Sequence, residues 1–217
     1  MRLVLAGVLL VCSAAAAAPA AAEPYDCPPA CDSIPESAWV APADIPLYPR
    51  YGWPQLSDVA KKAVAPRFRF EEVCATPPLP ADPRDYAVSG RATVVSPQGQ
   101  WQLQAQILHW RGEVWRGGEL VGEVFAAAVE ALRSCQRTNL FASPSVTVDG
   151  PDRMAAVVSG PVILRQYLLA NPANSTISEL ALWSYAPPLT PWPAIVDEEV
   201  LDALGAPLCT AYIGSCP

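Results

Sequence analysis

The stretch WQLQAQILH, residues 101–109, has the clearest structural pattern in the chain. Apolar residues such as Trp101 and Leu103 alternate with glutamines, which predicts a β-strand with one buried face and one face in water. Residues 86–95 alternate in a similar way, and the Ser-Pro-Gln-Gly sequence at residues 96–99 is typical of a turn. The sequence therefore predicts that the two strands form an antiparallel hairpin.

A long helix and further strands are expected after this hairpin. Residues 119–136 place Val124 and Leu132 on one apolar stripe, so a helix is predicted to begin after Gly117-Gly118. Further elements are predicted as strands at residues 145–148, 154–169 and 177–185, a short helix at residues 197–204, and an early strand running from Phe68 toward Cys74. The predicted fold class is α+β, an antiparallel sheet with helices packed on one face.

The N-terminal part of the chain predicts a signal peptide followed by a proline-rich arm. Residues 1–22 combine a positive charge, an apolar run and small residues, as in a secretory signal that is cleaved before Glu23 or after Ala20, or kept as an anchor. Residues 23–83 hold 13 prolines among 61 residues, which argues against long helices and central strands. Their tryptophans indicate an arm that packs on an α+β domain at residues 84–217.

The charge balance restricts the classes of partner. The chain has 14 basic and 21 acidic residues and a formal net charge of −7. An acidic surface repels phosphate backbones and anionic lipid headgroups, so nucleic-acid binding is not expected. Beyond the N-terminal run, no segment has the length of about 20 apolar residues that a membrane span needs, so we expect no stable membrane insertion. An exported, acidic monomer is the expectation.

Six cysteines follow the predicted signal, and an even number in an exported chain predicts disulfides. They are Cys27, Cys31, Cys74, Cys135, Cys209 and Cys216. Sequence proximity and the expected elements favour the pairs Cys74–Cys135, Cys209–Cys216 and Cys27–Cys31, while pairing of Cys27 or Cys31 elsewhere stays open. The Cys27–Cys31 spacing also resembles half of a zinc site. The only histidine is His109, so neither a metal nor another cofactor is expected.

Two sets of residues are candidates for function. The first is a surface formed by Trp110, Arg111, Trp115 and Arg116, because tryptophan and arginine dominate binding hot spots. The alternative for these four residues is ordinary packing at a sheet edge. The second set contains carboxylates that a hydrolase could use, namely Glu71, Glu72, Asp82, Asp85, Glu119, Glu123 and the acids of residues 197–202. The alternative for these acids is a structural role, because acidic residues are favoured at the starts of helices. His109 is in phase with Trp101 and is expected at the edge of the core.

Two cysteine-bearing segments suggest a family. Phe125 to Cys135 (FAAAVEALRSC) and the tail Leu208 to Cys216 resemble the extracellular sensor-type domain of mycobacterial receptor serine/threonine kinases and related exported lipoproteins. The resemblance covers residues 86–216, and the proline-rich arm departs from the pattern. It implies an α+β fold with a ligand-binding cleft, and it supplies no catalytic residue.

Together these observations predict an exported, non-catalytic binding or interaction protein of the cell envelope or medium. Its expected partner is a small molecule, a glycan or an envelope protein. The alternative is a secreted carboxylate-dependent hydrolase acting on envelope glycans or esters, with Glu72 and His109 as candidate participants. A third hypothesis is a disulfide-stapled structural component of the envelope.

Overall fold

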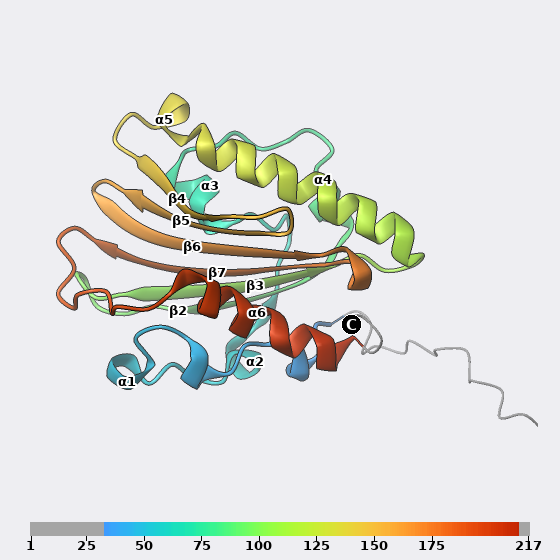
Figure 1. Ribbon diagram of the computed structural model, residues 1–217, viewed down its shortest axis with the longest axis horizontal. Helices are drawn as coiled ribbons and strands as arrows, with labels where there is room; N and C mark the ends of the chain where they lie inside the picture. Colours follow the sequence, from blue (N-terminus) through green and yellow to red (C-terminus); the bar gives the residue numbers. More distant parts are fainter. Residues whose placement is uncertain (1–32, 213–217) are drawn as a thin grey trace, which may run out of the picture.

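The computed structural model describes residues 33–212, which form a seven-stranded antiparallel sheet with helices packed against it (Figure 1). The strand order is β1-β2-β3-β7-β6-β5-β4. The strands are β1 (Lys61–Lys62), β2 (Val88–Val94), β3 (Gln102–His109), β4 (Ser143–Asp149), β5 (Arg153–Ser159), β6 (Val162–Asn171) and β7 (Thr176–Tyr185). The predicted α+β class with an antiparallel sheet is confirmed.

The hairpin predicted at the centre of the chain is also confirmed. Strands β2 and β3 pair from Val88 opposite His109 to Val94 opposite Leu103. The meander β4-β5-β6-β7 then returns to the hairpin, because β7 pairs along the whole of β3. Strand β3 therefore lies in the interior of the sheet with a neighbour on each side.

Helices cover both faces of this sheet, which corrects the expected placement on one face (Figure 1). Leu164 and Leu168 of β6 face one core with α4, whereas Tyr167 and Leu169 face a second core with α6. The first face carries α3 (Arg69–Val73), α4 (Val114–Arg133) and α5 (Cys135–Thr138), and the second carries α6 (Asp197–Ala211). The two cores explain why β7 is buried at nearly every position along its length.

The two main helices are longer than predicted, because glycines that were expected to lie at their ends lie inside them. Helix α4 begins at Val114 and includes Gly117, where an added Cβ would lie 2.1 Å from the Ser175 hydroxyl oxygen. Helix α6 continues through Gly205 and Pro207 to Ala211. These glycines permit close packing against neighbouring elements, and this role overrides their low helix propensity.

Residues 34–60 of the arm pack on the second face of the sheet. Its short elements are η2 (Glu36–Ala38), η3 (Pro42–Asp44), α1 (Tyr48–Tyr51) and α2 (Leu56–Val59). Trp39, Ile45 and Trp53 are buried in the core shared with α6. The chain then passes the sheet edge as β1, where Lys61 and Lys62 pair with Arg91 and Gly90. Exposed lysines on an edge strand oppose pairing with a further strand.

The expected strand from Phe68 toward Cys74 is instead the short helix α3. Phe68 and Phe70 are buried on the first face of the sheet. The Glu71 carboxylate accepts a 2.7 Å hydrogen bond from the backbone N–H of Phe68, the residue before the helix. This local cap favours a helical turn over the extended backbone that the alternation indicated.

One predicted disulfide is confirmed, since Cys74 is bonded to Cys135. It joins the end of α3 to the start of α5 across 61 residues of sequence. Cys209 is also disulfide-bonded. The predicted pairs Cys209–Cys216 and Cys27–Cys31, and the predicted signal peptide at residues 1–22, involve positions outside the described residues. Within residues 33–212, no helix has the length and apolar character to cross a membrane.

Candidate functional site

The predicted surface residues divide into one core residue and three exposed ones. Trp110 is buried, its indole N–H donates a 3.0 Å hydrogen bond to the carbonyl of Pro83, and its backbone N–H donates to the carbonyl of Ser175 at 2.9 Å. Trp110 therefore ties the end of β3 to two neighbouring loops. It is not available to touch a ligand at the surface.

Arg111, Trp115 and Arg116 lie at the surface around the start of α4. Trp115 is 61% exposed, and the guanidinium of Arg116 lies over its ring at 5.4 Å from the centroid. Gly112 has a φ of 102° and supports the turn between β3 and α4. Arg111, which precedes Gly112, lies near Lys62 at the β1 edge of the sheet.

Arg111 also lines a groove at that edge, between residues 62–66 and residues 85–88. The sheet-edge groove, as we call it, has a volume of about 550 Å³. Ligand pockets usually measure roughly 300–1,000 Å³, so its size suits a small molecule or a short segment of chain. Val64 and Tyr86, which are 89% and 77% exposed, give the groove an apolar and aromatic rim.

The groove forms because two paired segments separate. The Ser89 hydroxyl donates a 2.7 Å hydrogen bond to the Ala63 carbonyl and continues the β1–β2 contact by one residue. Ala65 then has a φ of 48°, which turns the chain away from β2. On the other side, the short helix η4 (Pro83–Tyr86) carries Tyr86 to the rim.

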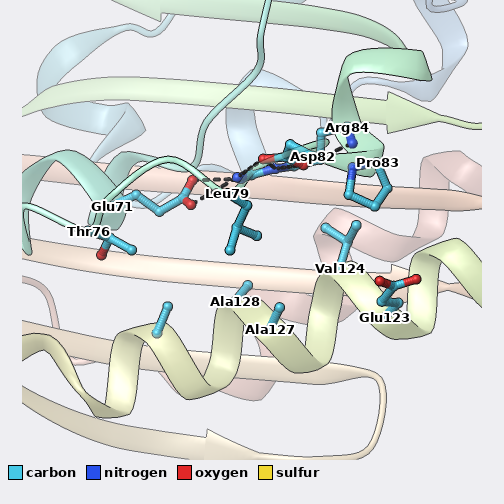
Figure 2. A pocket seen from close by; sticks show the side chains of 11 residues that line it. Glu71, Thr76, Leu79, Asp82, Pro83, Arg84, Glu123, Val124, Ala127 and Ala128 are labelled. Atoms are coloured by element: carbon cyan, nitrogen blue, oxygen red, sulfur yellow. Dashed lines mark hydrogen bonds and ion pairs between the residues drawn. The ribbon is translucent and has the colours of Figure 1, made fainter.

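A smaller pocket lies between α4 and the loop at residues 76–84 (Figure 2). Its volume is about 80 Å³, smaller than the roughly 150 Å³ of an engineered apolar cavity that holds benzene. Figure 2 shows Val124, Ala127 and Ala128 of α4 on one side, and Leu79 and Arg84 opposite. The small side chains of α4 leave this space, which is too small for a ligand of ordinary size.

Arg84 forms the charged wall of this pocket, with Glu71 and Asp82 as its partners (Figure 2). Its two terminal nitrogens reach the two Glu71 oxygens at 2.6 and 3.0 Å, and its Nε–H points at Asp82 at 2.9 Å. The guanidinium also lies over the Phe68 ring, 5.0 Å from the centroid. The buried cation is thereby surrounded by acceptors and an aromatic face.

These contacts fix the charge states of the cluster. Burial raises the pKa of the Asp82 carboxyl, but the hydrogen bonds and positive charge of Arg84 outweigh it and hold this pKa below its ordinary value. Burial lowers the pKa of Arg84, yet its two carboxylate partners raise it above the ordinary value. Glu71 and Asp82 are therefore engaged in holding the loop against the sheet.

A second buried carboxyl, Glu179 of β7, lies on the first face of the sheet and has no exposed surface. It accepts hydrogen bonds from the backbone N–H of Arg69 at 2.6 Å, and from the side-chain amides of Gln104 and Gln166 at 3.0 Å each. No cation touches its oxygens among the described residues. Burial raises the pKa of Glu179 from 4.5 to about 7, although the hydrogen bonds and the nearby charge of Arg91 act in the opposite direction.

This network corrects the expected wet face of β3. Gln104 and Gln106 are buried, because the chain at residues 67–73 passes over them. The guanidinium of Arg91 donates to the Gln106 side-chain carbonyl at 2.7 Å and to the Arg67 backbone carbonyl at 2.8 Å. The glutamines thus bind a returning segment of the chain and do not face water.

His109 lies at the edge of the core, as its position in the strand predicted. It is partly buried, stacks on Tyr212 at 4.6 Å between ring centroids, and lies 3.3 Å from the Thr176 hydroxyl through Nδ1. Burial lowers the pKa of His109. Its contacts are those of a packed side chain.

The remaining candidate carboxylates are spread over the molecule. Glu72 pairs with Arg69, and Asp202 pairs with Arg153 at 2.8 Å. Asp197 accepts a 2.7 Å hydrogen bond from the Tyr167 hydroxyl. Within residues 33–212 no three His, Cys, Asp or Glu side chains gather as metal ligands would.

Sequence reasoning missed three residues that matter for these sites: Glu179, Tyr86 and Val64. Glu179 shares the strand period of Ile177 and Ala181, so an acid in phase with apolar residues was the available signal. For Tyr86 and Val64 the sequence held no signal, because their exposure depends on where β1 and β2 separate.

No protein-family model matches the chain, and no match was found among curated proteins or among solved structures. The resemblance to extracellular sensor-type domains therefore stays a prediction.

Proposed function

We propose that this protein is an exported, non-catalytic binding protein whose ligand site is the sheet-edge groove together with the exposed turn that carries Trp115. The observation that carries this proposal is the groove itself. A volume of about 550 Å³ lies beside Arg111, at a rim that exposes Tyr86 and Val64.

The chemistry of the rim, and of the exposed turn that follows Arg111, favours a ligand with a flat ring or a sugar face. Tyr86 and Trp115 offer aromatic surfaces to water, and stacking on such surfaces buries much area with little loss of side-chain entropy. Arg111 and Lys62 add donors for an acceptor or anionic group on the same ligand.

The state of the carboxylates supports binding over hydrolysis. Glu71 and Asp82 are held by Arg84, and Glu179 has no exposed surface. A general acid or base must reach the bond that it cleaves, and these three groups are engaged away from the groove.

Native mass spectrometry of the protein secreted by its own host tests the proposal. We expect extra mass in the native spectrum that is lost on denaturation. In Trp115→Ala and Tyr86→Ala variants, the affinity for the bound species should fall about tenfold or more, as at a binding hot spot.

Phe141→Ala is the matched control, because Phe141 is 78% exposed and precedes β4 at the opposite end of the sheet. Its affinity should equal that of the wild type. Equal binding by all three variants would place the site elsewhere. Trp110 is unsuitable for this test, since its loss would disturb the core.

A further inference from the structure

The two ends of the sheet differ in charge. One end, at the left in Figure 1, is formed by the β2–β3 turn, the β5–β6 turn, the segment between α5 and β4, and the segment after β7. None of these four segments contains Asp, Glu, Lys or Arg, although these types make up 16% of the chain. The runs without these residues continue into the flanking strands and comprise residues 92–110, 138–148, 154–164 and 180–196. We call this part of the molecule the uncharged end.

The turns at the opposite end of the sheet show the contrast. The turn between β3 and α4 carries Arg111 and Glu113, and the turn between β4 and β5 carries Asp152. Surface turns are where charged side chains are normally found, because both lie in water. The lack of charge is therefore a property of one end and not of the turns of this protein in general.

Apolar side chains project from the uncharged end. Those that are between 52% and 84% exposed are Val95, Leu140, Phe141, Tyr185 and Leu189. Backbone hydrogen bonds join the segments that carry them, since Leu189 donates to the carbonyl of Gly99 at 2.8 Å and Ala186 donates to that of Pro161 at 3.0 Å. An added Cβ on Gly160 would lie 2.3 Å from the Phe141 carbonyl oxygen, so the segment before β4 adjoins the β5–β6 turn. The projecting side chains therefore form one surface across the end of the sheet.

The apolar area of this surface is large for a monomer. At about 200 Å² for a fully exposed side chain of this size, the five side chains present on the order of 700 Å². The largest apolar patch of a typical monomer is about 300–600 Å². A standard protein interface buries about 800 Å² on each partner and is depleted of charge at its centre. The uncharged end thus has the size and composition of an interface.

A hollow beside Leu140 makes the surface self-complementary. The hollow has a volume of about 240 Å³ and is lined in part by Val73 and Pro161. Asn139 and Phe141 also line it, whereas Leu140 between them is not part of its wall and is 84% exposed. A cavity of roughly 150 Å³ accommodates benzene, so a leucine side chain fits this hollow. A contact with two-fold symmetry needs a projection and a matching recess on the same surface.

The charge of the protein favours the same arrangement. With a formal net charge of −7, two copies repel each other, and anionic lipid repels each copy. Contact through the uncharged end keeps the charged parts of the two copies apart. Arg69 and Glu72, which line the hollow, are paired with each other. A neutral lipid surface would use the projecting side chains but not the recess.

We propose that the protein forms a two-fold symmetric dimer through the uncharged end, with Leu140 of each copy seated in the hollow of the other. This dimer replaces the monomer that the charge balance predicts. It leaves the sheet-edge groove of each copy open, because the groove adjoins Val88, at the opposite end of β2 from the β2–β3 turn.

Sedimentation equilibrium of the full secreted protein tests the dimer. Between about 1 and about 200 µM, the range in which a micromolar complex dissociates, the mass should rise from one chain to two. Raising the salt from about 0.05 to about 0.5 M should tighten the dimer at least threefold, because it screens the repulsion between two acidic chains. A protein that stays monomeric, or a dimer that salt weakens, would overturn the proposal.

Two aspartate variants locate the contact. Leu140→Asp should raise the Kd at least tenfold, because it places a charge in an apolar recess. Val114→Asp is the matched control, since it adds the same charge to a residue that is 56% exposed at the opposite end of the sheet, and its Kd should change less than twofold. Equal urea midpoints of the variants and the wild type check that both fold. A dimer that tolerates Leu140→Asp as well as the control would refute the contact.

Flotation with neutral phosphatidylcholine vesicles separates a second copy from a lipid surface. The wild type should stay with the unbound fraction. Vesicle binding by the wild type that is lost in Leu140→Asp would make the uncharged end a lipid contact and would overturn the dimer.

Discussion

Two buried acids, Glu71 and Glu179, differ in whether a cation balances their charge. Glu71 is paired with Arg84 through two hydrogen bonds, so its charge is balanced where it lies. Glu179 has only neutral donors at its oxygens, and burial therefore favours its protonated form. Removing the Arg84 side chain would leave the buried Glu71 and the partly buried Asp82 without the cation that they share, whereas removing the charge of Glu179 relieves the interior of an unbalanced charge.

Glu179→Gln should change how stability depends on pH. A carboxyl with a pKa of about 7 in the folded protein and 4.5 when unfolded takes up a proton on folding. The free energy of unfolding of the wild type therefore falls as pH rises from about 4.5 to about 7, by about 3 kcal/mol in total, and is level above that range. The variant lacks this contribution and should be the more stable protein at pH 8.

Urea unfolding between pH 5 and pH 8 measures this difference. The two proteins differ only at residue 179, so the contributions of all other groups cancel when the two curves are subtracted. The glutamine amide fits the network if the Gln104 side chain rotates to accept from it. A difference that does not vary with pH would show that Glu179 is charged throughout this range.

At the scale of the elements, glycines in α4 allow close approach of another segment. Gly117 and Gly118 lie against the turn η5 (Pro172–Asn174) and the residue after it, where added Cβ atoms would lie 2.1 Å from the Ser175 hydroxyl and 2.9 Å from the Pro172 carbonyl. Gly122 lies one turn further along the same helix with nothing within 4 Å. The first two glycines are required by packing, and the third only weakens the helix.

Alanine at these positions should therefore act with opposite sign. Gly117→Ala should lower the free energy of unfolding by about 1–3 kcal/mol, because its methyl group overlaps Ser175. Gly122→Ala should raise it by about 0.5–1 kcal/mol, because alanine restricts the unfolded chain and favours the helix. Denaturant midpoints of the two variants measure the effect, and a shift of the same sign in both would disprove the packing role.

At the scale of the whole molecule, the chain before β2 packs on both faces of the sheet. Trp39 and Trp53 pack on the face of α6, β1 extends the edge, and Phe68 and Phe70 pack on the face of α4. The Cys74–Cys135 bond closes this path, and the Thr138 hydroxyl donates to the Cys74 carbonyl at the same junction. The arm is thus integral to the fold.

Replacing both Cys74 and Cys135 by alanine should destabilise the protein by about 2–4 kcal/mol. The bond closes a loop of 61 residues, for which the loss of chain entropy in the unfolded state gives about 4 kcal/mol. Thermal unfolding under oxidising conditions measures the change, with the remaining disulfides verified by peptide mapping. An unchanged midpoint would mean that the hydrogen bonds of this junction hold it without the bond.

The sequence by itself determined the local elements. The β2–β3 hairpin, the body of α4 and the later strands follow from periodicity, because a side chain's place on a strand or helix depends on residues a few positions away. The Cys74–Cys135 pair was also inferred from the ends of predicted elements. Of the four candidate surface residues, Arg111, Trp115 and Arg116 are exposed and Trp110 is buried, and their role in binding stays a prediction.

Only the tertiary structure decided which faces are covered. The alternation of β3 predicts that its glutamine face is exposed to solvent. Residues 67–73 instead pass over this face and bury both the glutamines and Glu179. The pairing of β3 with β7, the helical glycines and the sheet-edge groove likewise depend on segments distant in sequence. Burial is a property of contacts between such segments, and no local pattern contains it.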